Sequence, residues 1–289
     1  MQNVLRTLIY DGQVSLTLVD TTALVKEGAL KHALSAGSAY AFGKAISAMT
    51  FMSACLKGET GEISLSLKTE GGCEEIAVSG NQKLYMRGYI QNTQLDGGGN
   101  AETERAALGE NGSLTIIRDD GYSRPFVGAC ALPQEGGIDE AFEEYFRISE
   151  QLPTRICTVV ECEENGVHFA GVAALQPLPF ADAATIEKVQ NFDMRALLAE
   201  IKKAGVEAAA KGLFAEVNEV WELREAAYRC NCSREYLTRV LVSLGNEQMR
   251  AIIREDGAVR IHCHYCNTDY EFTETDADAL FPPKKNAAR

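Results

Sequence analysis

The fold of the C-terminal part of this chain is decided by two stretches, Arg229-Cys-Asn-Cys-Ser233 and Cys263-His-Tyr-Cys-Asn267. Zinc in proteins takes four tetrahedral ligands, and thiolates are among those it prefers. A C-x-x-C turn between two strands presents two thiolates on one side, and a C-x-C pair at the entrance of a helix can supply the other two. The spacing therefore predicts a four-thiolate zinc site made of Cys230, Cys232, Cys263 and Cys266.

The residues around these motifs predict a small zinc-binding unit that spans 230–289. Ser233 is a good helix cap, and its helix ends at Gly245. A second short helix ends at Gly257, and alternating apolar residues predict a strand on each side of the C-x-x-C turn. Thr273-x-x-Asp276 has the form of a capping box for a last helix.

Such a unit depends on its metal. About sixty residues have only a marginal core, and a structural zinc supplies on the order of 10 kcal/mol of folding free energy. Oxidation of the thiolates expels the metal, and each pair is close enough in sequence to bridge locally. Because such short loops constrain the unfolded chain little, they cannot replace zinc. We therefore expect the unit to unfold when it is oxidised.

Other readings of the cysteines compete with a redox switch. Four unrelated buried cysteines do not account for the paired spacing. A thioredoxin-type C-x-x-C opens a helix, whereas a strand follows here, and it leaves Cys230 and Cys232 unexplained. A permanent structural zinc would use the same four ligands, so this alternative to a redox switch stays open. His262 and His264 are potential ligands, but four thiolates already complete the tetrahedron, so we treat both as bystanders.

The segment 177–229 is predicted to be a helical, metastable linker. Gln176-Pro177-Leu178-Pro179 marks its start. Alanine fills many of the following positions, and the apolar face is narrow. Such helices are marginal in water unless they dock on a neighbour. We expect Trp221 to anchor the last of them.

Residues 1–176 are predicted to form an α+β core domain, because strands dominate and cluster instead of alternating regularly with helices. A hairpin turn is expected at Asp11-Gly12, and a polar, Gly-rich loop over 93–112. Helices are expected over 22–32, over 39–56 with Ser38 as its cap, and after a cap at Asp139. Strands are expected over 4–10, 13–19, 63–68, 75–78, 84–89, 114–117, 155–161 and 167–174.

Composition narrows the classes of function. The 289 residues carry a net charge of −13, which disfavours binding of a polyanion such as nucleic acid. The apolar run 39–56 contains Lys44 and several hydroxyl residues, so a buried helix is expected and not a membrane span. The N-terminus has no signal-peptide pattern, and nine cysteines then indicate reduced thiols in a cytoplasmic protein. Five of them are scattered and are expected to be buried and inert: Cys55, Cys73, Cys130, Cys157 and Cys162.

The chain resembles a known family along nearly its whole length. The cysteine motifs, Ser243-Leu-Gly245 and Glu255-Asp-Gly257 are similar to the redox switch of the bacterial heat-shock holdase chaperones of about thirty-three kilodaltons. The body is similar to that family at five further motifs, in order: Asp11-Gly-Gln-Val14, Asp20-Thr-Thr22, Leu56-Lys-Gly-Glu59, Arg87-Gly-Tyr-Ile-Gln-Asn92 and Ser149-Glu-Gln-Leu-Pro153. Asn231 departs from the pattern, since the family often has an acid there.

The resemblance implies a cytoplasmic, ATP-independent chaperone that is no enzyme and is inactive while reduced and zinc-bound. It implies that oxidation forms two disulfides, Cys230–Cys232 and Cys263–Cys266, releases zinc, and unfolds the switch and the linker. The active form is then expected to bind unfolding client proteins and to form a homodimer, with no nucleic acid or membrane as partner.

The alternative is a zinc-ribbon protein that binds RNA through a permanent structural zinc. Residues 230–289 hold 8 Lys and Arg against 9 Asp and Glu, a net charge of −1 with no basic stripe, which argues against it. A phosphate loop at Gly37-Ser-Ala-Tyr-Ala-Phe-Gly43-Lys44 has one residue too many between its glycines. A catalytic oxidoreductase is disfavoured, because the sequence has no dinucleotide-binding fingerprint.

Overall fold

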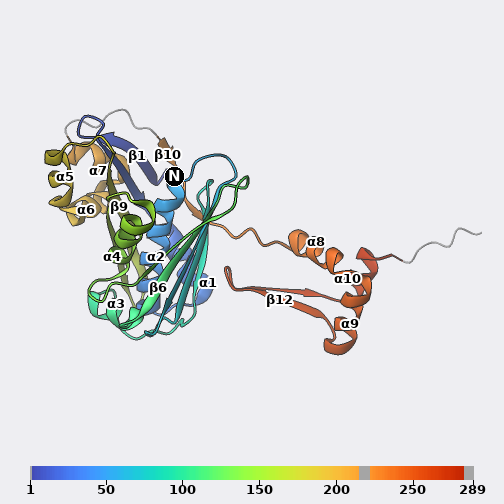
Figure 1. Cartoon of the computed structure of the whole chain (residues 1–289). Coiled ribbons are helices and arrows are strands. Elements are labelled where there is room, and N and C mark those ends of the chain that lie inside the picture. Colours follow the sequence, from blue (N-terminus) through green and yellow to red (C-terminus); the bar gives the residue numbers. More distant parts are fainter. Residues whose placement is uncertain (1, 215–221, 283–289) are drawn as a thin grey trace, which may run out of the picture. The chain divides into compact units, whose positions relative to one another are not determined.

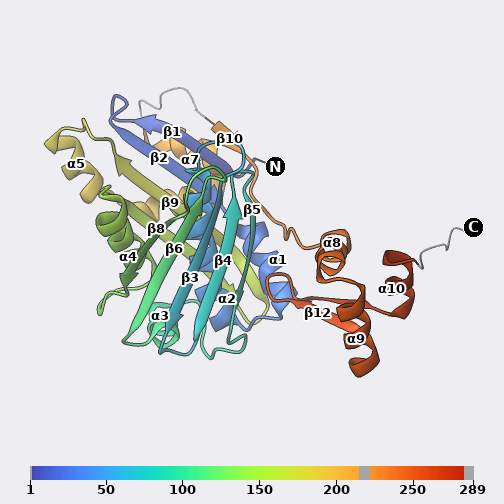
Figure 2. The same cartoon turned by 45° about the vertical axis from the view of Figure 1, so that its right-hand side comes forward.

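The computed structural model describes residues 2–214 and 222–282. The chain divides into two compact units, Met1–Arg229 and Cys230–Arg289. Figures 1 and 2 show their helices and strands. Helices and strands are mixed in both units, which confirms the α+β class.

The first unit contains a five-stranded antiparallel sheet with the order β10-β1-β2-β9-β8. Its strands are β1 (Val4–Ile9), β2 (Val14–Asp20), β8 (Arg155–Glu163), β9 (Gly166–Pro177) and β10 (Glu222–Arg224). The hairpin predicted between β1 and β2 is confirmed. Tyr10, Asp11 and Gly12 all have positive φ in its turn, at 51°, 52° and 79°, a conformation that glycine adopts without strain.

A six-stranded sheet of the same unit has the order β11-β5-β4-β3-β6-β7, and β11 is its one parallel neighbour. Its strands are β3 (Glu62–Thr69), β4 (Glu75–Asn81), β5 (Tyr85–Ile90), β6 (Gly112–Asp119), β7 (Phe126–Ala131) and β11 (Ala227–Tyr228). The sequence did not predict β7, because glycine and alanine occupy half of its positions and have weak strand propensity.

Helix α2 (Ala36–Ala54) contacts strands of both sheets and is buried along nearly its whole length, while α1 (Thr22–His32) packs beside it. The buried helix predicted here is confirmed, but its cap is Ser35 instead of Ser38. The Ser35 hydroxyl accepts a hydrogen bond from the Ser38 backbone N–H at 3.2 Å. In the described part of the chain, no helix has the length and apolarity needed to cross a membrane.

A buried ion cluster corrects two further predictions. Lys44 of α2 lies 2.8 Å from Glu104 and 3.5 Å from Asp139. Glu104 belongs to α3 (Ala101–Leu108), in the stretch predicted as a loop; its helix is capped by the Asn100 side chain. Asp139 is inside α4 (Ile138–Tyr145), which continues as a π-helix, η1 (Phe146–Glu150). Asp139 is therefore no cap; its carboxylate accepts hydrogen bonds from Thr158 instead.

The predicted linker begins as helices that cover the outer face of the five-stranded sheet. They are α5 (Ala183–Gln190), α6 (Met194–Ala204) and α7 (Val206–Leu213). Their apolar residues form one core with the side chains of that face, Leu5, Ile9, Val14, Leu16, Leu18, Phe169, Ala173 and Leu175. Helix does not continue to 229, as the sequence suggested, because 222–224 and 227–228 pair with β1 and β5 as strands β10 and β11. Trp221 lies outside the described residues.

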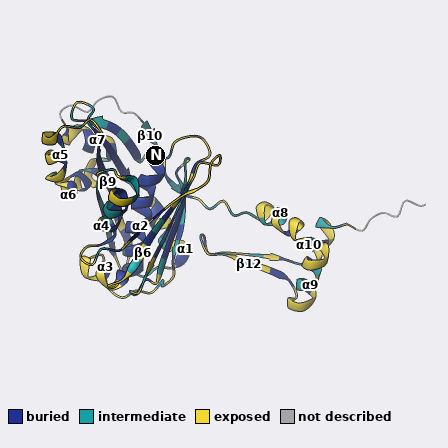
Figure 3. Ribbon diagram, in the orientation of Figure 1, coloured by how far each residue is buried: buried dark blue, intermediate teal, exposed yellow. Residues whose placement is uncertain are grey.

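The second unit has a much smaller core. It contains α8 (Arg234–Leu244), α9 (Asn246–Asp256), the hairpin of β12 (Val259–Cys263) and β13 (Thr268–Phe272), and α10 (Glu274–Leu280). Among its described residues, six form the buried core: Leu241, Met249, Ile253, Val259, Phe272 and Ala277. Figure 3 shows its helices as largely exposed, whereas buried residues fill the first unit. The caps predicted at Ser233 and Thr273 are confirmed.

Candidate metal centre

The four cysteines of the sequence motifs meet at one end of the second unit. Cys230 and Cys232 precede α8 directly, where Ser233 caps the helix. Cys263 ends β12, and Cys266 lies in the turn that leads to β13. The turn is closed by the Asn267 backbone N–H, which donates to the Cys263 carbonyl at 2.8 Å.

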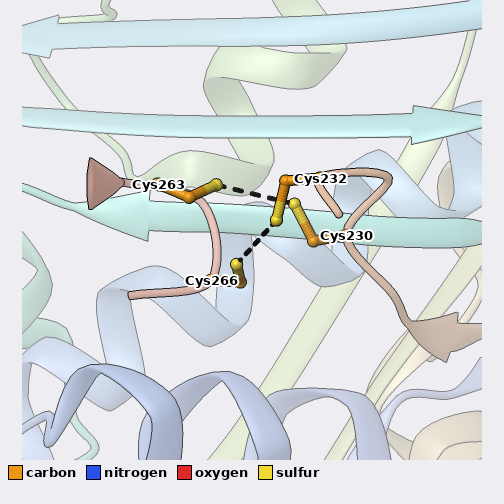
Figure 4. A group of neighbouring side chains, drawn as sticks. All are labelled: Cys230, Cys232, Cys263 and Cys266. Carbon is orange, nitrogen blue, oxygen red and sulfur yellow. Dashed lines mark hydrogen bonds between the residues drawn. The ribbon is translucent and has the colours of Figure 1, made fainter. Parts of the chain in front are cut away.

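The sulfur atoms are turned toward one another (Figure 4), and all four lie within 4.8 Å of one another. Two close contacts join the two motifs: Cys230 Sγ lies 3.7 Å from Cys263 Sγ, and Cys232 Sγ lies 3.2 Å from Cys266 Sγ. All four are free thiols in this structure.

This arrangement fits a tetrahedral metal ion. Sulfur ligands about 2.3 Å from zinc lie roughly 3.8 Å apart from one another. The separations of 3.2 and 3.7 Å between the motifs are slightly shorter than that value and no sulfur pair exceeds 4.8 Å, so small movements of the side chains complete the tetrahedron. Soft thiolates select zinc over hard cations such as calcium or magnesium. The four residues are therefore positioned to hold a metal ion, and their donor chemistry suits zinc.

Crowding of the thiols makes the cluster favour a cation. Burial is the main reason why the pKa of Cys266 is raised to about 11, and burial also raises the pKa of Cys230. Burial acts against ionisation of Cys232 as well, but hydrogen bonds from Tyr270 and the neighbouring thiols outweigh it and lower its pKa to about 7. Cys232 is therefore easier to ionise than Cys230 and Cys266. A divalent cation favours the ionised form of such thiols, because thiolates are its ligands.

Two residues that the sequence did not single out contact the thiols, and a third joins the elements around them. The Tyr270 hydroxyl lies 3.3 Å from Cys232 Sγ, and the Thr268 hydroxyl accepts a hydrogen bond from the Cys266 thiol at 3.3 Å. Arg234 stacks its guanidinium 4.4 Å from the centre of the Phe272 ring and pairs with Asp276 at 2.7 Å. These contacts join α8, the hairpin and α10. Sequence alternation marked Tyr270 only as a strand residue.

The two histidines beside the turn are not part of the group. His262 Nδ1 lies 2.8 Å from Asp269 Oδ1, and the His262 ring packs edge-on against His264. Among the described residues, the four cysteines are the one set of side chains with the geometry of a metal site. The remaining cysteines do not join them: Cys73, Cys130 and Cys162 are buried in the first unit, while Cys55 and Cys157 are half-buried there.

The residues just before Cys230 are tied to the first unit. The Tyr228 hydroxyl donates to the Gly88 carbonyl at 2.8 Å and lies 3.2 Å from His32 Nε2. The Arg229 backbone N–H donates to the Met86 carbonyl at 2.7 Å, and its guanidinium lies 4.5 Å from the centre of the Tyr85 ring. Residues 222–229, which we call the strap, are therefore docked on the first unit. Helical periodicity could not predict this docking.

The chain has two α+β units, and the smaller one brings four thiols together, as in metal-binding proteins. Comparison with known proteins identifies the family within this class. The family model described as Hsp33 protein matches residues 2–273. The chain is 31% identical to the 33 kDa chaperonin of Bacillus licheniformis, over 97% of this chain and 99% of that protein, and 30% identical to that of Bacillus cereus, over 95% and 97%. The crystal structure of the 33 kDa chaperonin (heat shock protein 33 homolog) from Thermotoga maritima superposes with a TM-score of 0.82 at 25% identity, covering 96% of this chain and 97% of that chain.

The chain belongs to the Hsp33 family. Membership places it among the heat-shock chaperones and confirms the family resemblance seen in the sequence. The RNA-binding alternative finds no support in these relatives.

Proposed function

We propose that this protein is a redox-regulated, ATP-independent holdase of the cytoplasm, which binds unfolding proteins under oxidative stress and transforms no substrate. Zinc held by Cys230, Cys232, Cys263 and Cys266 keeps the second unit folded and the chaperone inactive. The observation that carries the proposal is the position of the four-thiol site, which follows directly after a segment docked on an apolar sheet face.

The domain boundaries follow from this proposal. Residues 1–176 form the core domain, 177–229 the linker, and 230–289 the switch. The linker helices bury Leu197, Leu198 and Ile201 against the sheet. Short helices are marginal without such docking, so we expect unfolding of the switch, which begins directly after Arg229, to loosen the linker. Undocking then exposes two apolar faces, one on the helices and one on the sheet, and these bind clients.

The redox step acts through the thiols themselves. Each disulfide forms when two thiols lose two electrons and two protons to an oxidant such as peroxide, which is reduced to water. We propose the local pairs Cys230–Cys232 and Cys263–Cys266. In the folded site the crossed pairs, Cys230 with Cys263 and Cys232 with Cys266, also lie close together. Crossed disulfides would fasten the start of α8 to the hairpin turn, whereas local disulfides leave the two motifs free to separate.

Peptide mapping by mass spectrometry after peroxide treatment tests this pairing. We expect the two local disulfides together with zinc released in a one-to-one ratio to protein. Crossed disulfides, or four oxidised thiols with zinc retained, would contradict the release mechanism.

Exposed apolar faces also account for a homodimer in the oxidised form, since two copies can cover each other's linker surfaces. The net charge of −13 keeps such a protein soluble and makes nucleic acid an unfavourable partner.

The function itself is tested by light scattering of a heat-labile enzyme that is unfolding under mild heat. We compare the zinc-loaded reduced protein with the same protein after peroxide treatment, without ATP. Strong suppression of aggregation by the oxidised form alone is expected. Equal suppression by both forms, or none by either, would show that the four-thiol site does not control a holdase. A variant with all four cysteines intact but Cys55→Ser serves as the control for oxidation elsewhere.

A further inference from the structure

A cavity of about 640 Å³ lies between the core domain and α5, the first helix of the proposed linker. Residues of α4 and η1 line one part of it, and Ile186, Val189 and Gln190 of α5 line another. The start of β8 and the end of β9 contribute Arg155 and Pro177. Figures 1 and 2 show α5 near α4. The volume of the cavity is in the range in which proteins hold small molecules, about 300–1,000 Å³.

Most of the surface of this cavity is apolar. Its apolar lining consists of Pro133, Pro153, Pro177, Ile186 and Val189. Helix α5 buries little of itself, since Val189 is one of only two buried residues among its eight. Ile186 is half-buried and faces the cavity wall that α5 provides. An apolar molecule in the cavity would remove surface of both walls from water and so stabilise the docked position of α5.

The charged part of the lining favours a cation over an anion. Three glutamates, Glu140, Glu143 and Glu144, line the cavity together with two arginines, Arg147 and Arg155. Both guanidinium groups already have acceptors. Arg147 donates two hydrogen bonds to Glu144, at 2.7 and 2.6 Å. Arg155 donates to a backbone carbonyl at the C-terminal end of α5 and lies 3.4 Å from Glu143. An anionic ligand would therefore have to displace these pairs.

Glu143 is a half-buried carboxylate in the wall of the cavity. It accepts a hydrogen bond from the Ile156 backbone N–H at 3.0 Å and lies close to the Arg155 side chain, and both contacts use Oε1. Burial is the main cause that raises the pKa of this carboxyl group. The carbonyl groups at the end of α5 add the partial negative charge of a helix C-terminus. A positive charge in the cavity would stabilise the ionised form of Glu143.

We propose that this cavity binds a small organic cation, a protonated amine on an apolar body, and that the bound molecule holds α5 against the core domain. The ammonium group pairs with Glu143, and the apolar body lies against the prolines and Ile186. Because α5 forms part of the site, the ligand binds only while α5 is docked and therefore stabilises the docked state. Its effect on chaperone activity rests on the proposed function: the ligand opposes release of the linker and keeps the reduced protein inactive.

Isothermal titration calorimetry of the full-length, reduced, zinc-loaded protein tests the binding. The probes share one apolar body and differ in charge: phenylbutylamine is a cation, phenylbutanol is neutral and phenylpentanoate is an anion. We expect the amine to bind at one site and the anion not to bind. The alcohol should bind about tenfold more weakly than the amine or worse, because it loses a hydrogen bond between charged groups.

A matched pair of variants locates the site. Glu143→Gln keeps the acceptor for Ile156 but removes the charge, so it should weaken amine binding by about tenfold or more and leave binding of the alcohol unchanged. Glu187→Gln removes the same charge from α5 next to Ile186, but Glu187 is exposed and does not line the cavity. It should bind the amine within about twofold of the unaltered chain, because salt screens an exposed charge.

Amide exchange of α5 measures whether the ligand holds the linker. A ligand that binds only the docked state, supplied at about ten times its Kd, should slow exchange through opening of α5 by about tenfold. Exchange in β3 and β4 of the other sheet should not change. After peroxide is added, suppression of client aggregation should also develop more slowly with the amine present than with phenylpentanoate.

The proposal is overturned if the amine does not bind, if the alcohol or the anion binds as well as the amine, or if Glu143→Gln and Glu187→Gln behave alike. Binding that leaves the exchange of α5 unchanged would also overturn it. Should Glu143→Gln fail to fold, as judged by circular dichroism, the probe series and the exchange data on the unaltered chain still decide. Binding and exchange are measured on reduced protein without clients, so the proposed redox function can fail while the cavity site stands, and the reverse.

Discussion

Cys266 is the most buried of the four thiols, and it contacts Cys232 and Thr268 within 3.3 Å. It lies in the tight turn of the hairpin, which the Asn267 N–H closes by donating to the Cys263 carbonyl. A hydroxyl at this position is a poor ligand for a soft metal site. The consequence for the smaller unit is large, because six core residues provide little folding free energy without the metal.

We therefore predict that Cys266→Ser lowers zinc content well below one per chain and unfolds the second unit while the first stays folded. Elemental analysis and amide exchange measure the two effects. The matched control is Cys55→Ser, a half-buried thiol outside the group, which should keep its zinc. A fully zinc-loaded and protected Cys266→Ser protein would exclude Cys266 as a ligand.

Asp139 links acidity to the stability of the first unit. Burial is the main cause that raises its pKa to about 6, although Lys44 and hydrogen bonds from Thr158 act the other way. An unfolded aspartate titrates near pH 3.9, so the folded state holds its proton more tightly between about pH 4 and 6. The contribution of Asp139 is fully present below the unfolded pKa and is lost as pH rises through about 6.

The prediction is that the first unit is relatively more stable at pH 5 than at pH 7, and that Asp139→Asn flattens this dependence. Two units of pKa correspond to at most about 3 kcal/mol. Urea unfolding at both pH values, followed by tyrosine fluorescence, measures it. Asp182→Asn, an exposed helix cap, is the control and should leave the slope between these values unchanged. A wild-type slope retained in Asp139→Asn would assign the pH dependence to other groups.

At the scale of elements, α6 is the best-packed helix of the proposed linker. Leu197, Leu198 and Ile201 are essentially inaccessible to solvent, and Asp193 caps the helix with two hydrogen bonds from backbone N–H groups. At the rim, Lys202 pairs with Glu161 of β8 at 2.5 Å, and the Arg155 guanidinium bonds the Gln190 carbonyl at the end of α5. Surface ion pairs contribute little to stability. Burial of apolar side chains must therefore keep the linker helices docked on the sheet.

Leu197→Ala should release the linker without oxidation. Truncating a buried leucine costs about 2–5 kcal/mol, which is enough to open helices that are marginal alone. We expect the reduced, zinc-loaded variant to suppress client aggregation and to lose amide protection in α5–α7. Leu213→Ala in the same segment is the control, because Leu213 is 38% exposed. If Leu197→Ala stays inactive although its linker amides exchange freely, linker release alone does not activate the chaperone.

At the scale of the whole molecule, two compact units of unequal core size imply two separable unfolding events. Removal of zinc by a chelator at neutral pH should abolish the helices α8–α10 and leave the two large sheets intact. Circular dichroism and limited proteolysis follow the loss, and re-addition of zinc under reducing conditions should restore it. A single cooperative transition with and without zinc would contradict the independence of the second unit.

The candidate metal site could be predicted from sequence almost completely. Cys230, Cys232, Cys263 and Cys266 are close in sequence as pairs, and a helix cap and a hairpin turn are local features that place each pair. The supporting contacts of Tyr270 and Arg234 could not be predicted, because they join elements that are more than thirty residues apart.

The sequence by itself also determined the α+β class, the β1–β2 hairpin, the buried helix α2 and the helical start of the linker, since each depends on periodicity or turn chemistry within a short window. Only the tertiary structure decided the rest. Strands β10 and β11 form because β1 and β5 offer edges to pair with. Strand β7 exists because β6 lies beside it. In each case the stabilising partner is distant in sequence, so no local pattern records it, and contact with that partner outweighs the weak local preference.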